Sequence, residues 1–203
     1  NLTKDETKSR FSSHQNELRT IEQYQNHLLD EDFRATGVRE NSILNELSNF
    51  HCTQNFAVDI MHDLYEGVVK YDLAKYLQIF IDDDNIQLSL KSLNALKQNF
   101  HYGSIEIGNL SKPISDIHLK NGALKMSASE SKTFITFLPL MIGHLVPRNN
   151  VYWKMILTLV DICDSVLSSC FTEETIDALE KKISFYLKKH VEKFGSNLRP
   201  KHH

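Results

Sequence analysis

Asp59 and His62 place a carboxylate and an imidazole three positions apart, at the start of an amphipathic stretch. At that spacing on a helix the two side chains lie over the same turn and can contact each other. The Asp59 carboxylate can also cap the helix by accepting hydrogen bonds from the amides of its first turn. The pair can therefore bind a metal ion or form a hydrogen-bonded latch. An aspartate cap followed by a histidine is also common as a purely structural feature, so the spacing alone leaves both interpretations open.

Two further groups of polar side chains have simpler interpretations. His51 and Cys52 can add metal ligands near Asp59, although a half-buried cysteine beside a surface histidine is the more common arrangement. The run from Asp82 to Asp84 lacks the ligand spacing of a calcium loop, which favours a solvated turn. The sequence contains no nucleophile elbow, no P-loop and no dinucleotide fingerprint, so hydrolytic triads and nucleotide chemistry have no support.

Lysines gather in the last predicted helix and are candidates for contact with DNA. Their charges can neutralise phosphates, although such a run is more often the solvated face of a helix. The formal net charge of −3 gives no global electrostatic case for nucleic acid. The candidate residues are Lys181, Lys182, Lys188, Lys189 and Lys193.

These side chains need helices to position them, and hydrophobic periodicity predicts helices over most of the chain. Apolar residues at Ile60, Leu64 and Val68 predict a helix from residue 59 to about residue 81. Further helices are expected over residues 89–100, 129–145, 151–167 and 173–194, with shorter ones over residues 13–29 and 41–47. Pro139 should kink the helix that contains it, because it removes a backbone donor.

The predicted fold class is mainly α with little β. Residues 101–125 are rich in glycine and form an irregular connector, where a short hairpin is the only β pairing expected. Residues 151–167 are apolar on nearly every side, which predicts a buried helix. Residues 1–35 are taken as a polar N-terminal segment and residues 36–203 as one helical region. The expected core consists of Leu64, Leu140, Trp153, Ile156, Leu157 and Val160.

The composition is that of a water-soluble globular protein. Of the 203 residues, 41% are hydrophobic and 24% are charged. No apolar run reaches about 18 residues, so no membrane span is expected. The three cysteines show no metal-ligand pair or disulfide framework, which favours reduced thiols in an intracellular protein. The chain starts at Asn1 without a charged and apolar leader, so we expect no signal peptide and predict a fragment of a longer protein.

Several motifs together resemble the transposases of CACTA-like cut-and-paste DNA transposons and the host proteins derived from them. The resemblance covers most of the chain from about residue 34 onward. Its main element is an Asp-x-x-His signature followed by an apolar run, and shorter matches precede and follow it in the same order. The matching segments are residues 36–39, 44–51, 58–64, 66–69, 137–143, 161–164 and 200–203.

The resemblance implies a catalytic domain of RNase H type in the full-length protein. Such enzymes use three carboxylates and two divalent ions such as Mg²⁺ for phosphoryl transfer. In the family pattern the catalytic aspartates belong upstream of residue 1 and the catalytic glutamate belongs downstream of residue 203. This chain then corresponds to the helical insertion region of the RNase H-like domain. We expect no catalytic residue in it and no activity of the chain alone.

The resemblance also implies a structural zinc ion. A distant cousin, the recombinase that assembles antigen-receptor genes, shares a zinc ion between an early pair of cysteines and a late pair of histidines. Asp59 and His62 resemble the early pair, and His202 and His203 resemble the late pair. We therefore expect these two segments, about 140 residues apart, to lie close together. The spaced histidine that should follow the late pair is missing, and a chain end or cloning remnant without function is the alternative for that pair.

Two functional hypotheses follow from the sequence. The first is a fragment of a DDE-type DNA transposase or of a transposase-derived protein. The full-length protein is then expected in the nucleus, with DNA and the remaining parts of the catalytic domain as partners of this fragment. The second is a helical protein-interaction module of a domesticated host protein, with no catalysis. Both allow a homo-oligomer, and neither involves a membrane.

Overall fold

The structure, a computed structural model, describes residues 18–55, 57–103, 109–195, 198 and 202, and every structural statement here concerns these residues. Their regular structure is helical, and no strand occurs among them. The prediction of a mainly α fold is therefore confirmed. None of the described helices combines the length and apolar character that a membrane span needs.

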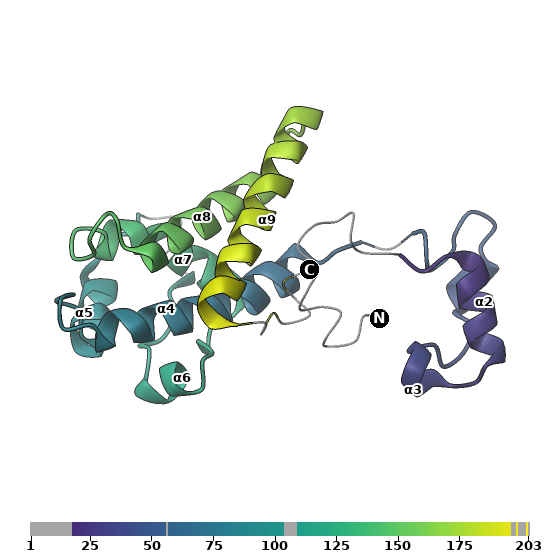
Figure 1. Cartoon of the computed structure of the whole chain (residues 1–203), viewed down its shortest axis with the longest axis horizontal. Helices are drawn as coiled ribbons and strands as arrows, with labels where there is room; N and C mark the ends of the chain where they lie inside the picture. The colour runs from purple at the N-terminus through teal and green to yellow at the C-terminus, as the bar shows by residue number, and fades with distance from the viewer. Residues whose placement is uncertain (1–17, 56, 104–108, 196–197, 199–201, 203) are drawn as a thin grey trace.

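The N-terminal part forms a small unit of α2 (Ile21–Leu29), α3 (Phe33–Thr36) and the short 3₁₀ turn η2 (Ile43–Glu46). Thr20 begins α2 with a capping box that it shares with Gln23. The buried Tyr24 ties the unit together, because its hydroxyl donates to the Glu40 carbonyl at 3.2 Å and accepts from the Ser42 amide at 3.0 Å. In Figure 1 this unit lies apart from the other helices. Residues 30–40, between two predicted helices, contain the short helix α3, which the sequence analysis did not predict.

The main body contains the helices that periodicity predicted, with bounds close to those expected. The signature segment is one continuous helical run, in which a π-helical part precedes an ordinary α-helix. The elements are η3 (Met61–Val69), α4 (Lys70–Asp82), α5 (Leu90–Asn99), α6 (Asp116–Lys120), α7 (Ala128–Ile142), α8 (Val151–Val166) and α9 (Glu173–Phe194). Figure 1 shows α9 crossing the body beside α8, with its first half projecting outward.

The core lies where η3, α4, α7, α8 and α9 meet, and it differs in part from the predicted one. Trp153 and Ile156 are buried as expected. Leu140 and Leu157 are 69% and 41% exposed, so their predicted burial is wrong. Both lie on the outward faces of their helices, where an apolar side chain is common and costs little. Leu64 and Val160 are partly buried against the core.

The connector contains a short helix, α6, and no strand among its described residues. Backbone groups of residues 111–114 in the connector are bound by side chains of α5. Asn94 donates to the Ile114 carbonyl and accepts from the Ile114 amide, both at 2.8 Å. The Lys97 ammonium donates to the carbonyls of Ser111 and Lys112 at 3.0 and 2.7 Å. Burial lowers the pKa of Lys97 to about 8. Residues 104–108 of the connector lie outside the described part.

Candidate functional site

Asp59 and His62 contact each other over the first turn of the signature helix, as their spacing predicts. The Asp59 carboxylate accepts a hydrogen bond from the His62 amide at 3.1 Å, and its other oxygen lies 2.7 Å from the His62 Nδ1. The hydrogen bond from the His62 side chain lowers the pKa of Asp59. Both side chains are more than half exposed. Asp59 and His62 therefore form the predicted hydrogen-bonded contact within one turn, where it caps the exposed start of the helix.

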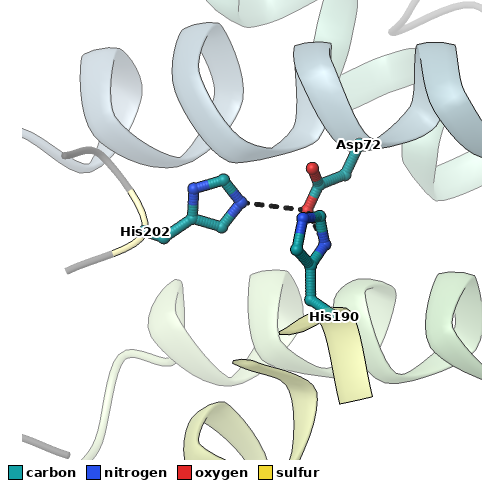
Figure 2. A group of neighbouring side chains, drawn as sticks. All are labelled: Asp72, His190 and His202. Carbon is teal, nitrogen blue, oxygen red and sulfur yellow. Dashed lines mark hydrogen bonds and ion pairs between the residues drawn. The ribbon is translucent and has the colours of Figure 1, made fainter. Parts of the chain in front are cut away.

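A second aspartate of the same helical run, Asp72, lies in the core of the molecule with no exposed side-chain surface. Three groups approach its Oδ2 atom. The Tyr186 hydroxyl donates a hydrogen bond to it at 2.6 Å, the His202 Nε2 lies 3.2 Å away and the His190 Nδ1 also lies 3.2 Å away. Figure 2 shows the two imidazoles converging on this carboxylate from separate segments of the chain.

Three segments position this cluster. Asp72 lies in the first turn of α4, whereas Tyr186 and His190 lie one turn apart on α9 and face α4. Gly195 ends α9 with a φ of 69°, a conformation that glycine adopts without strain. His202 follows in the sequence and is buried. Its ring centroid lies 5.0 Å from that of His190, so the two imidazoles pack against each other.

The electrostatics of the cluster follow from burial and from the two histidines. Burial alone would raise the pKa of Asp72, but the nearby His190 and His202 side chains outweigh it and hold the pKa below its usual value. Burial and the nearby Asp72 carboxylate raise the pKa of Tyr186 well above its usual value. The structure therefore contains an ionised carboxylate and a protonated phenol in contact.

Two buried atoms in the cluster have no hydrogen-bond partner. One is the Asp72 Oδ1 atom, and the other is the His190 Nδ1 atom, whose direction toward Asp72 does not suit a hydrogen bond despite the 3.2 Å separation. The Lys75 ammonium lies 3.8 Å from Asp72 Oδ1 and 3.3 Å from the His190 Nε2. Lysine only donates, so Nε2 is the acceptor and the His190 proton resides on Nδ1.

The cluster borders a pocket of about 180 Å³ between η3, α8 and α9. Tyr186 and His202 line it on one side, and Val58 and Ile60, which precede η3, line it on another. The segment that leads into the signature helix therefore lies beside His202 in space. The expected proximity of the two predicted histidine-bearing segments can be followed only for His202, because His203 lies outside the described residues.

The described residues contain one group of three potential metal ligands with all ligand atoms within 4.8 Å of one another: Asp72, His190 and His202. Only His202 belongs to the predicted zinc set. Asp59 and His62 pair with each other, and His203 lies outside the described residues. The zinc site made of Asp59, His62, His202 and His203 therefore stays a prediction.

The sequence analysis missed Asp72 and His190, although a signal for both was present. Asp72 lies four positions after Val68 on the apolar stripe of its helix, and His190 lies three positions after Leu187 on that of α9. A charged or polar residue on a buried stripe needs a partner. Two such residues in separate helices are therefore candidates for contact with each other.

The other polar groups serve local structure. The His51 Nδ1 lies 2.7 Å from the Thr53 hydroxyl, and the Cys52 amide donates to Asn45 at 2.9 Å. In the acidic run, Asp82 accepts hydrogen bonds from Gln78 within its helix. These contacts favour the structural interpretation of both groups.

The five candidate DNA-contact lysines lie along α9 between its ninth and its second-last residue. Lys182 pairs with Asp161 of α8 at 2.8 Å, and Lys189 pairs with Glu192 at 2.7 Å. Lys181, Lys188 and Lys193 are exposed. Contact of these lysines with DNA remains a prediction.

Comparison of the chain with protein-family models, with curated proteins and with solved structures gives no match. Any function assigned to the chain therefore rests on its own residues and their geometry. The buried cluster offers two chemical possibilities: a hydrogen-bonded junction between α4, α9 and the segment that contains His202, or a set of metal ligands.

Proposed function

We propose that this chain is a helical segment of a DDE-type DNA transposase, or of a protein derived from one, and that it acts as a scaffold rather than as the catalyst. The observation that carries the proposal is that the segment leading into the signature helix lies beside His202. Val58 and Ile60 line the same pocket as His202. A segment inserted into a sheet must begin and end at neighbouring points, and the proposal assigns these two segments to those points.

The absence of chemistry in this segment is part of the proposal. Two-metal phosphoryl transfer needs several carboxylates that converge on ions about 3.5–4 Å apart. In the described part of the chain, the one group of three potential ligands contains a single carboxylate, that of Asp72. The proposal places the catalytic carboxylates and their Mg²⁺ ions in flanking parts of a full-length protein. DNA, the remaining catalytic domain and a second copy of the protein are its proposed partners, in the nucleus.

The experiment that tests this proposal is recovery of the complete reading frame from the transcript. We expect aspartate-bearing strands upstream, and downstream a tryptophan followed by an Arg-Phe-Glu-like element. The full-length protein should then cut a plasmid that carries the terminal repeats flanking its gene, and replacement of the downstream glutamate by glutamine should abolish cutting. A reading frame without these elements would contradict the proposal.

A second candidate function is an interaction module without catalysis. Large apolar side chains are exposed over the N-terminal unit, among them Leu29, Ile43 and Leu47. Exposed apolar side chains that gather on one unit are typical of surfaces that contact another protein. The same reading frame distinguishes the two candidates, because this function needs no flanking catalytic strands.

A further inference from the structure

We propose that Asp72, His190 and His202 bind one divalent transition-metal ion of the zinc class. This inference does not depend on the proposed function, because it concerns a site built wholly within the chain. It also differs from the zinc site implied by the resemblance, since Asp72 and His190 replace Asp59, His62 and His203. The two sites share only His202.

The chemistry of the ligand set selects this class of ion. Two imidazole nitrogens and one carboxylate oxygen suit zinc, cobalt and neighbouring transition metals. Calcium and magnesium prefer sites made of oxygen ligands. The three side chains come from α4, from α9 and from position 202, so a bound ion would join segments that are distant in the sequence.

The ligand atoms already have nearly the spacing that a metal needs. Zinc bonds of about 2.0–2.2 Å place neighbouring ligand atoms of a tetrahedral site about 3.4 Å apart. Both imidazole nitrogens lie 3.2 Å from the Asp72 Oδ2. Each of the three residues offers one ligand atom within 4.8 Å of those of the other two. A modest rotation of the two rings would therefore complete three corners of a tetrahedron (Figure 2).

The unpaired buried atoms are the independent sign that a ligand belongs here. The Asp72 Oδ1 and the His190 Nδ1 are both buried without a hydrogen-bond partner. Buried polar atoms without a partner are rare in folded proteins, and a missing ion is one of the explanations for them. A metal bound at this cluster would satisfy His190 directly and would neutralise the charge of Asp72.

The neighbouring side chains suit the role of supporting groups, with one exception. The Tyr186 hydroxyl donates to the Asp72 carboxylate at 2.6 Å and would orient it, as partners of metal ligands commonly do. The exception is Lys75, whose ammonium donates to the His190 Nε2 at 3.3 Å. This hydrogen bond keeps the proton on the Nδ1 that must bind the metal.

Metal binding therefore requires Lys75 to move. The proton of His190 must shift to Nε2, and the ammonium must turn away from it. The Lys75 side chain is 25% exposed, so it can reach solvent by a change of rotamer. The Lys75 charge opposes the cation, which makes this residue a selective test of the site.

The pocket beside the cluster supplies access and a fourth ligand. Its volume of about 180 Å³ exceeds the roughly 30 Å³ that one water occupies in the liquid. Tyr186 and His202 line it, so a water there lies next to the proposed site. Three protein ligands and one water are the usual coordination of an open zinc site.

The test uses the 203-residue chain, stripped of metal with a chelator and dialysed. Titration with ZnCl₂ by calorimetry should show one bound ion per chain, and Co²⁺ should produce the visible absorption of a tetrahedral complex. His190→Gln should lower zinc affinity by about 100-fold or more, because loss of a direct ligand exceeds the 10–100-fold effect of losing an orienting partner. His62→Gln is the matched control and should bind zinc as the unsubstituted chain does.

Lys75→Met provides the second arm of the test. It should raise zinc affinity about tenfold, which is on the order of one like-charge interaction near a protein surface. Lys154→Met removes the same charge from an exposed position on α8 and should leave affinity unchanged. Circular dichroism of each variant shows that its helices persist.

Three results would overturn the proposal. The first is no zinc binding by the unsubstituted chain and by Lys75→Met, which would leave a hydrogen-bonded junction only. The second is unchanged affinity in folded His190→Gln. The third is loss of binding in His62→Gln, which would move the ion to the site that contains Asp59.

Discussion

Tyr186 is the side chain on which the buried cluster depends most. Its hydroxyl donates to Asp72 at 2.6 Å and lies 2.9 Å from the Tyr76 hydroxyl. Because the Tyr186 proton is committed to Asp72, Tyr76 must be the donor in the second hydrogen bond. The result is a buried chain of hydrogen bonds from Tyr76 through Tyr186 to the carboxylate.

This order of donors makes the two tyrosines unequal. Tyr186→Phe should lower the free energy of unfolding by about 1.5–3 kcal/mol, because it removes a hydrogen bond to a charged group and leaves Tyr76 without an acceptor. Tyr76→Phe removes only a neutral hydrogen bond and should cost about 0.5–1.5 kcal/mol. Urea denaturation of both variants measures the difference. Equal losses would contradict the inferred direction of donation.

The pKa of Asp72 predicts how the stability of the metal-free protein depends on pH. The folded-state pKa lies below the usual value, so the folded state favours the ionised carboxylate. The stabilisation is fully present above the unfolded pKa of about 3.9 and is lost as the pH falls through the folded pKa. Asp72→Asn should remove this acid-dependent part, so its stability should fall less between pH 5 and pH 2. Chemical denaturation at several pH values checks this, and Asp84→Asn at an exposed position is the control.

At this scale the sequence predicted local contacts better than distant ones. Asp59 and His62 are neighbours on one turn, so helical spacing was sufficient to predict their contact. Asp72 meets residues more than 100 positions away, and their contact depends on how α9 packs on α4. Periodicity places a residue on a face of its helix, but it does not select the helix that covers that face.

Among the elements, α8 shows why an apolar sequence predicts a buried helix but not every buried residue. Ile156 and Leu157 are adjacent in the sequence, yet Ile156 has no exposed surface and Leu157 is substantially exposed. The helix packs against α4, α7 and α9 and leaves one side to solvent. Because the residues on the exposed side are also apolar, the sequence shows no hydrophobic periodicity that distinguishes the exposed side of α8 from its buried side.

The two neighbours therefore form a matched pair. Ile156→Ala should lower the free energy of unfolding by about 2–5 kcal/mol, because it leaves a cavity in the core. Leu157→Ala should cost less than Ile156→Ala, about 1–2 kcal/mol, because 41% of the Leu157 surface is already exposed in the folded state. Thermal or urea denaturation of the two variants tests the orientation of α8. A larger loss of unfolding free energy for Leu157→Ala than for Ile156→Ala would show that Leu157, and not Ile156, faces the core.

In the connector, the sequence pattern did not predict which groups bind the backbone. Its sequence pattern predicted no partner for the backbone of residues 111–114, which the side chains of Asn94 and Lys97 bind. These two residues belong to a helix whose pattern gave no sign of this role. The predicted long helices succeeded because each is specified by its own periodicity and cap, as with Ser127 and Thr172.

For the whole molecule, the arrangement of acids predicts a protein that does not process DNA by itself. Asp72 is enclosed in the core, and Asp82 and Asp83 accept local hydrogen bonds. We expect the purified chain to leave supercoiled plasmid intact in the presence of Mg²⁺ or Mn²⁺, as judged by gel electrophoresis. Metal-dependent nicking that Asp59→Ala abolishes would refute this expectation.

The meeting of Asp72 with His202 has a consequence for the order of events in folding. The two residues are 130 positions apart, so their contact closes one of the longest loops in the chain. Such closure is entropically costly, and the local pairing of helices should be well advanced before it occurs. His202→Gln should therefore accelerate unfolding while leaving the refolding rate nearly unchanged, as expected for a contact absent from the transition state. Stopped-flow measurements in urea would show a shift of the unfolding limb alone. The late contact would then stabilise the native state by slowing its unfolding.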